Sequence, residues 1–234
     1  MTNQSGLNEY LKPGIYVDSD SPEVLDFVQD HAKGDTPKEK AISLFLAVRD
    51  DFWYDPYDIV FEPDEFKASE IIKKKKGFCV TKAIILAAVL RAAGIPSRLG
   101  FADVKNHLNT ERLREMMNTE IFYYHGFTEL FLDGQWLKVT PTFNKDLCDK
   151  FGVLPLDFDG TSDCIFHSYD IKGNKHMEYV KFHETYADCP YELLVSEYHR
   201  AYPNMFTKES AANNSNFAQE AGEERNKDGN HRHY

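Results

Sequence analysis

The feature that most constrains this chain is an apolar segment headed by a cysteine. Between Val80 and Ala93 most residues are apolar, and they cover nearly the whole circumference of a helix instead of one stripe. A helix without a polar face has to be buried, so we expect it to form the centre of the fold. Gly94 stands where a left-handed residue would end the helix, and Pro96 prevents its continuation.

Cys79 stands at the start of this predicted helix, directly after Gly77-Phe78. Its sulfur would face the unpaired N–H groups and the positive end of the helix dipole, an environment that favours the thiolate. Gly77 would allow the backbone to pass closely just before the cysteine. Taken alone, the pattern more often marks a buried structural cysteine. The case for a nucleophile therefore depends on a base elsewhere in the chain.

Composition narrows the class of protein. The 234 residues are 42% hydrophobic and 14% aromatic, enough for one full core. The net charge of −11 opposes binding to nucleic acid or to anionic membranes, so we expect neither as a partner. The first residues form no apolar signal segment, and no run is long enough to span a bilayer. The cysteines are scattered, which favours reduced thiols and a cytoplasmic location.

The pattern of elements predicts one domain with two appendages. Residues 1–20 read as an irregular arm, residues 21–204 as the domain, and residues 205–234 as a polar tail that is disordered or loosely docked. Thr36 and Glu39 form a capping box that opens a helix to about Asp51. The pattern weakens between residues 145 and 190, where we expect loops and small elements around the core.

An aromatic and acidic stretch follows that helix. Residues 52–66 are too irregular for one element, and Trp53 is a candidate for lining a cleft, although core packing is the more common role of such side chains. The acidic residues of the stretch suggest a basic or neutral substrate. The run from Lys73 to Lys76 would lower the pKa of Cys79 if it lay close, but we interpret it as a solvated face.

A hairpin carries the candidate base. Two strand-like runs within residues 121–144 flank Asp133-Gly134, a strong turn signal. With those residues in the turn, Phe131 pairs with Trp136, and continuing the register outward places His125 opposite Thr142. Because side chains alternate along a strand, His125, Thr140 and Thr142 then share one face.

These two segments together resemble the transglutaminase-like superfamily. The first is GFCVTKAIILAAVLRAAGIPSR at residues 77–98, and the second is HGFTELFLDGQWLKVTPTFN at residues 125–144. The resemblance covers roughly residues 36–144. It implies an α+β fold with a papain-like core, in which the buried helix led by the cysteine packs on an antiparallel sheet.

The resemblance also implies a chemistry. Cys79 would attack an amide or other acyl carbonyl, and His125 would take its proton and later protonate the leaving group. The Cys79 N–H would be one oxyanion donor, and Trp53 could supply a second. This predicts a peptide or amide hydrolase or transamidase that acts on a peptide or protein substrate and requires no cofactor or metal.

The chain departs from the family pattern at Thr140. The family has an aspartate there that orients the histidine, and a hydroxyl cannot stabilise an imidazolium as a carboxylate does. Asn144 is a possible substitute, since papain-like enzymes use an asparagine. The departure supports an alternative, a catalytically silent domain that binds a peptide or a partner protein.

A third hypothesis is a metal site in the later part of the chain. The candidate ligands are Cys164, His167, His176, His183 and Cys189. Their spacings are irregular and include no paired short motif, so we interpret them as unrelated side chains.

Overall fold

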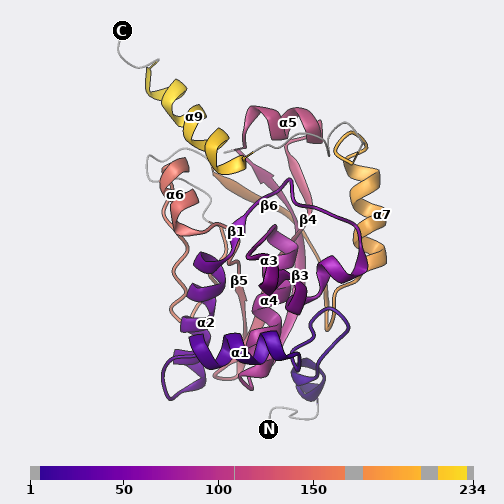
Figure 1. The fold of residues 1–234 in the computed structure, drawn as a ribbon, viewed down its shortest axis with the longest axis vertical. Coiled ribbons are helices and arrows are strands. Elements are labelled where there is room, and N and C mark those ends of the chain that lie inside the picture. The colour runs from indigo at the N-terminus through magenta and orange to yellow at the C-terminus, as the bar shows by residue number, and fades with distance from the viewer. Residues whose placement is uncertain (1–5, 108, 167–175, 207–215, 231–234) are drawn as a thin grey trace.

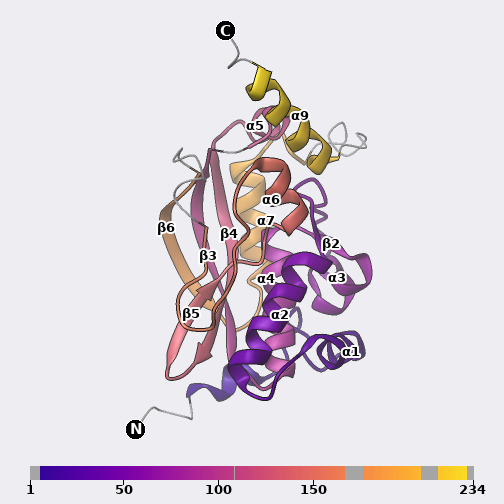
Figure 2. The ribbon, with the colours of Figure 1, turned by 90° about the vertical axis from the view of Figure 1, so that its left-hand side faces the viewer.

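A computed structural model describes residues 6–107, 109–166, 176–206 and 216–230. An antiparallel four-stranded sheet, in the order β5-β4-β3-β6, forms one layer, and the helices from the first part of the chain form the other (Figures 1 and 2). The predicted α+β architecture is confirmed.

The elements follow one another along the chain with these bounds. The helices are α1 (Pro22–His31), α2 (Pro37–Asp51), α3 (Ala68–Lys74), α4 (Cys79–Ala92), α5 (Glu111–Met117), α6 (Lys145–Phe151), α7 (Tyr191–Ala201) and α9 (Phe217–Asn230), with short 3₁₀ helices η2 (Asn8–Leu11) and η3 (Pro63–Phe66). The strands are β1 (Trp53–Tyr54), β2 (Lys76–Gly77), β3 (Ser97–Asn106), β4 (Ile121–Leu132), β5 (Gln135–Val139) and β6 (Met177–Tyr186).

Helix α4 is the centre of the molecule, as its composition predicts. Every residue from Cys79 to Arg91 is buried. The helix packs against β3 and β4 on one side, and against α1, α2 and α3 on the others. Gly94 adopts φ 80° just beyond it, the left-handed conformation that ends a helix at little cost for glycine.

The capping box of α2 is present as predicted. The Thr36 hydroxyl accepts the Glu39 N–H at 3.2 Å, and the Glu39 carboxylate accepts the Thr36 N–H at 2.9 Å. These two bonds satisfy donors that the first turn cannot pair within the helix. The start of the helix is therefore fixed by local chemistry.

The hairpin register is also confirmed. Phe131 pairs with Trp136, and the ladder continues to Thr128 opposite Val139. Asp133 and Gly134 form the turn, with φ 50° and 87°. Strand β5 ends at Val139, so the expected continuation of the ladder to His125 opposite Thr142 is wrong, and Thr140 and Thr142 follow the strand.

Strand β6 is a finding that the sequence pattern did not indicate. It pairs antiparallel with β3 and forms one edge of the sheet. Val180 and Phe182 are 60% and 49% exposed, so the strand lacks the alternation of apolar and polar residues that reveals a half-buried strand. Between residues 145 and 190 the chain thus contributes α6 and a strand of ten residues, more regular structure than the expected loops.

Part of the predicted polar tail forms helix α9. Phe217 is only 3% exposed and packs edge-on against Tyr54, with ring centroids 5.6 Å apart. Ala221, one turn later, is also buried, so two apolar side chains at helical spacing hold the start of this helix on the domain. Residues 207–215 and 231–234 of the predicted tail lie outside the described residues.

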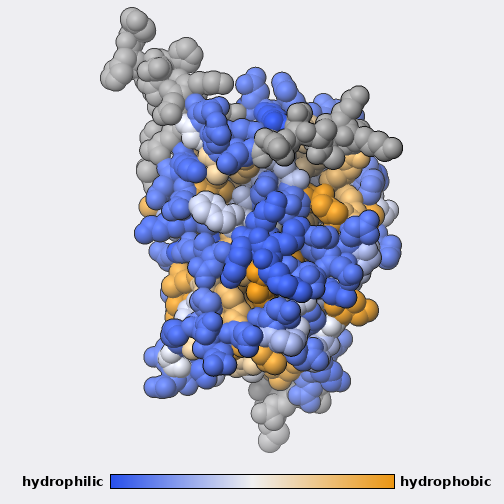
Figure 3. Space-filling view, viewed as in Figure 1, coloured by the Kyte–Doolittle hydropathy of each residue, from blue (hydrophilic) through white to orange (hydrophobic). Residues whose placement is uncertain are grey.

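The surface is rich in polar and charged side chains, as the 28% of charged residues in the sequence leads one to expect (Figure 3). The face in Figure 3 is mostly hydrophilic, with small and separate apolar areas. In the described part of the chain, no helix has the length and apolar composition that crossing a membrane requires.

Candidate functional site

Cys79 is held at the first turn of α4 by local contacts. The Thr81 hydroxyl accepts the Phe78 N–H at 2.9 Å and donates to the Phe78 carbonyl at 3.1 Å. A Cβ at Gly77 would lie 2.4 Å from the Thr81 hydroxyl oxygen, so a side chain there would displace the hydroxyl that holds this turn. The close contact at Gly77 is therefore made by a side chain, and not by the backbone as we expected.

Strand β4 brings His125 to this turn. A Cβ on the neighbouring Gly126 would lie 2.8 Å from the Cα of Val80, closer than real atoms approach. The absence of a side chain therefore lets the strand lie directly on the first turn of the helix. As a result, Cys79 and His125 line one pocket of about 380 Å³.

The other walls of this pocket come from several elements. They are the loop after β1, α5, the beginning of β4, α7 and the turn after it. The lining side chains are Tyr54, Pro56, Ile59, Phe78, Leu113, Met117, Phe122, Tyr123, Tyr198, Tyr202 and Met205. Apart from the hydroxyls of the tyrosines and the imidazole ring, these side chains carry no nitrogen or oxygen.

A β-bulge precedes His125. Ala102 pairs with His125, whereas Val104 pairs with Phe122, so two residues of β4 face Asp103 alone. Tyr124, in the bulge, has φ 51°, which is strained for a bulky residue. Bulges of this kind redirect the side chains beside them. This bulge therefore influences the direction in which the His125 side chain points from β4.

Three side chains hold the bulge in place. The Asp103 carboxylate accepts the Tyr124 N–H at 3.2 Å and lies 2.8 Å from His183 Nε2. The Tyr198 hydroxyl donates to the Tyr124 carbonyl at 3.2 Å. The strain at Tyr124 is therefore offset by hydrogen bonds from β3, β6 and α7.

Burial controls the ionisation of the two candidate catalytic groups. It raises the pKa of Cys79 to about 11, although the N–H groups of Gly126, Val80 and Cys79 itself favour the thiolate. It lowers the pKa of His125 to about 3. The expected bias of Cys79 toward thiolate is wrong for this structure, because desolvation outweighs the helix N-terminus. At neutral pH the site holds a thiol and a neutral imidazole.

Two lysines of the run from Lys73 to Lys76 form ion pairs with carboxylates of the acidic loop, and within the described residues neither of them pairs with Cys79. Lys76 forms an ion pair with Asp58 at 2.8 Å, and Lys74 pairs with Asp58 and Glu65. Lys73 and Lys75 are exposed, as the expected solvated face requires, and the ion pairs of Lys74 and Lys76 link that face to the preceding acidic loop. These ion pairs also neutralise part of the acidic rim from which a basic or neutral substrate was predicted.

Neither candidate for the third catalytic residue contacts His125. The Asn144 side chain accepts the Tyr54 N–H at 3.3 Å, and so it anchors the strand that leads into the pocket. Among the described residues, His125 Nε2 has no hydrogen-bond partner, whereas the Thr140 hydroxyl interacts with the Tyr179 hydroxyl. The buried Thr142 hydroxyl has no partner among the described residues, and Thr142 lines a second cavity, of about 230 Å³, together with His125.

Trp53 does not reach the pocket. Its N–H donates to the Lys75 carbonyl at 3.0 Å as part of the short parallel pairing of β1 with β2, and its side chain is 51% exposed. The next residue, Tyr54, pairs with Gly77 in the register and lines the pocket instead.

Sequence reasoning also missed two tyrosines at the end of α7. Tyr198 lies in the last turn of this helix, Tyr202 directly follows it, and both line the pocket. Their spacing is the signal that could have indicated a shared buried face. Their position over Cys79 depends on tertiary packing.

The comparisons with known proteins agree with this arrangement. A family model described as the transglutaminase-like superfamily matches residues 26–141. The chain belongs to the transglutaminase-like superfamily. The residues matched by the family model include the whole of α4 and the hairpin that carries His125.

A solved structure gives a weaker likeness. It is the crystal structure of a candidate cysteine protease from Cytophaga hutchinsonii, with 16% identity and a TM-score of 0.46. The match covers 60% of this transglutaminase-like chain and 43% of that chain, so this chain spans less than half the length of that structure. No curated protein gives a significant match.

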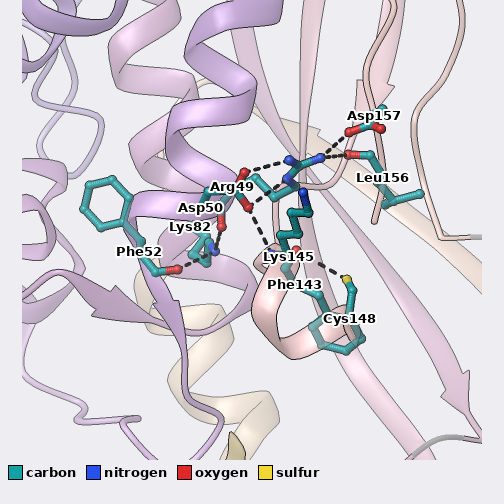
Figure 4. Close-up of polar contacts among 9 residues, drawn as sticks. All are labelled: Arg49, Asp50, Phe52, Lys82, Phe143, Lys145, Cys148, Leu156 and Asp157. Atoms are coloured by element: carbon teal, nitrogen blue, oxygen red, sulfur yellow. Dashed lines mark hydrogen bonds and ion pairs between the residues drawn. The ribbon is translucent and has the colours of Figure 1, made fainter. Parts of the chain in front are cut away.

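A buried charged cluster lies at the end of α2 of this transglutaminase-like chain (Figure 4). Lys82 on α4 is fully buried, and its Nζ donates to the Arg49 and Phe52 carbonyls at 2.8 Å and 2.7 Å. Burial lowers the pKa of Lys82 to about 7. The Arg49 guanidinium in turn donates to the Leu156 carbonyl at 2.8 Å and pairs with Asp157. This cluster fixes the end of α2, from which the chain enters β1.

The side chains considered for a metal site have separate environments. His183 lies against Asp103 and stacks on Tyr124, with ring centroids 4.1 Å apart. Cys164 forms an isolated bridge with Val139. His167 lies outside the described residues, and within them no group of three potential ligands is placed to hold a metal ion.

Proposed function

We propose that this chain is a cysteine-dependent acyl-transfer enzyme that hydrolyses or transamidates a peptide, a protein amide or a related acyl compound. The observation that carries the proposal is the single pocket that contains both Cys79 and His125. The close approach of Gly126 to α4 supports it, because that contact fixes the base-bearing strand beside the nucleophile. Membership of the transglutaminase-like superfamily is consistent with this chemistry.

The reaction proceeds through a thioester. As Cys79 Sγ attacks the carbonyl carbon, its proton passes to the His125 imidazole. Cleavage of the bond to the leaving group follows, and the leaving group takes the proton from the imidazolium. Water or an amine then attacks the thioester and restores the thiol. We assign the Cys79 N–H, at the first turn of α4, as the oxyanion donor.

The pKa values determine when the proton moves. Because the thiol has a pKa of about 11 and the imidazolium one of about 3, transfer between them in the closed pocket costs on the order of 10 kcal/mol. Attraction between the thiolate and the imidazolium offsets about 4 kcal/mol of this cost at a separation of about 4 Å. Proton transfer is therefore coupled to attack on the substrate, and a stable thiolate–imidazolium pair does not precede it.

The test measures turnover of an activated acyl donor. We expect the protein to release para-nitrophenolate from para-nitrophenyl acetate and to transfer the acetyl group to water or to an added amine. Cys79→Ala abolishes this activity, and His125→Ala lowers it by about 10² to 10⁴. Cys164→Ser, which removes another buried thiol, leaves it unchanged. Equal rates in the protein and in Cys79→Ala would reject the proposal.

A silent binding domain is the second candidate. The observation that favours it is the lack of any described hydrogen-bond partner for His125 Nε2, because an imidazolium without an acceptor is poorly stabilised. In that case the pocket binds a partner without forming a thioester. Retained ligand binding with no acylation of Cys79 distinguishes this function from the enzyme.

A further inference from the structure

The walls of the Cys79 pocket restrict what can enter it. Among the described residues that line it there is no aspartate, glutamate, lysine or arginine. Leu113 and Met117 from α5 form one wall, and Phe122 from β4 and Phe78, which directly precedes α4, form others. A charged group that enters the pocket loses its hydration and meets no countercharge.

The hydroxyls of Tyr198 in α7 and of Tyr202 directly after it already form hydrogen bonds with the backbone. The Tyr202 hydroxyl accepts the Tyr123 N–H at 2.6 Å and donates to the Ile121 carbonyl at 3.1 Å. The Tyr198 hydroxyl donates to the Tyr124 carbonyl. Burial raises the pKa of both tyrosines, so they stay neutral. Their rings form part of the pocket wall, and their hydroxyls have little remaining capacity to hydrogen-bond a ligand.

The size of the pocket fits a single group. The space of about 380 Å³ at Cys79 includes the part that opens to solvent, so its enclosed part is small. It therefore favours one small group, with the reacting carbonyl at Cys79. A folded polypeptide segment does not fit within it.

We propose that the pocket selects an apolar acyl group, either a short alkanoyl or an arylalkanoyl group, for transfer to Cys79. This inference rests on the proposed acyl-transfer function and specifies its substrate class. In the step, the bond between Sγ and the carbonyl carbon forms and the bond to the leaving group breaks. The proton passes from Sγ through His125 to the leaving group. Apolar surface of the acyl chain is buried against the walls as the thioester forms.

A chain-length series tests the selection. Para-nitrophenyl acetate, butanoate and hexanoate are compared by the rate at which each acylates Cys79, divided by the rate with free N-acetylcysteine. Burial of each added methylene predicts an increase of about fourfold. Rates that stay flat along the series overturn the inference while leaving the acyl-transfer function intact. Absence of a Cys79 adduct with every ester overturns that function.

A binding measurement separates the inference from the chemistry. Isocaproamide and succinamate have similar shapes, but only succinamate carries a charge. We expect isocaproamide to protect Cys79 from iodoacetamide at concentrations roughly a hundredfold lower than succinamate does. Equal protection by both compounds, or better protection by succinamate, contradicts an apolar site even if the protein has no acylating activity.

A matched pair of variants assigns the effect to the pocket. Ile59 lines the pocket and is partly buried, whereas the adjacent Val60 is 44% exposed and lies in another cleft. Ile59→Arg is expected to reduce the preference for isocaproamide over succinamate at least tenfold, because it provides the missing countercharge. Val60→Arg is the control and should leave the preference as it is. The same response in both variants would contradict selection by the pocket walls.

Discussion

Lys82 and His125 are both buried beside helix α4, but their surroundings differ. Lys82 Nζ donates to two carbonyls, and its neighbour Arg49 has carboxylate and carbonyl partners (Figure 4). In contrast, His125 Nε2 and the Thr142 hydroxyl, which line one cavity, have no partner among the described residues. The first cluster is complete without any added molecule, and the second is not.

This difference separates a structural role from a functional one. A buried polar cluster with all its hydrogen bonds made holds elements in place, and the Lys82 cluster holds the end of α2. A buried polar atom without a partner costs stability, and proteins retain such atoms mostly where a ligand or a reaction uses them. The comparison therefore predicts that substitutions in the first cluster reduce stability, while substitutions in the second change mainly chemistry.

The largest expected effect is the loss of Lys82. Lys82→Met keeps most of the side-chain volume but leaves the Arg49 and Phe52 carbonyls without this donor. We expect the free energy of unfolding to fall by about 2–4 kcal/mol. Urea denaturation measures this as a lower midpoint with an unchanged slope. A loss below about 1 kcal/mol would show that the cluster does not hold the fold.

The next effect is a pH dependence that arises from His125. Its folded-state pKa, about 3, is below the unfolded value of about 6.5, so the unfolded chain binds a proton that the folded chain does not. Stability is therefore lost as pH falls from about 6.5 toward 3, at up to about 1.4 kcal/mol per pH unit. Between pH 7 and pH 5, His125→Asn should lose about 2 kcal/mol less than the parent protein.

The matching measurement is urea unfolding of both proteins at pH 7 and at pH 5. Other titrating groups are common to the two proteins, so their contributions cancel in the difference. Identical losses on acidification would mean that His125 is solvated in the folded protein.

The smallest expected effect is at Thr142. Thr142→Val removes a hydroxyl that has no described partner, so stability should change by less than about 1 kcal/mol or increase. Thr128→Val is the matched control, because the fully buried Thr128 hydroxyl donates to the Ala83 carbonyl at 2.9 Å. We expect the control to cost about 1–2 kcal/mol. A larger cost at Thr142 than at Thr128 would reverse the assignment of the two clusters.

Much of the fold could be predicted because its signals are local. The apolar circumference of α4, the capping box at Thr36 and the Asp133-Gly134 turn each depend on a few neighbouring residues. The register of the hairpin follows from its turn, and the confirmed pairing of Phe131 with Trp136 shows this. Strand β6 has no such signal, since its exposed apolar side chains obscure the alternation.

The site was less predictable because its properties depend on tertiary packing. The bulge at Tyr124 exists through hydrogen bonds to Asp103 and Tyr198, which are distant in sequence. The raised pKa of Cys79 results from burial beneath α7 and β4, which no local pattern indicates. The place of Cys79 and His125 in one pocket was predictable from the two motifs, whereas their ionisation and the apolar walls were not.

The most direct test of the central claim is the mass of the intact protein after brief reaction with para-nitrophenyl hexanoate, followed by mapping of the modified peptide. The account predicts one hexanoyl group on Cys79 in the parent protein and a much slower appearance of this adduct in His125→Ala. Labelling at the other cysteines instead, or an adduct on Cys79 that forms equally fast without His125, would contradict the claim that these two residues act as a catalytic pair.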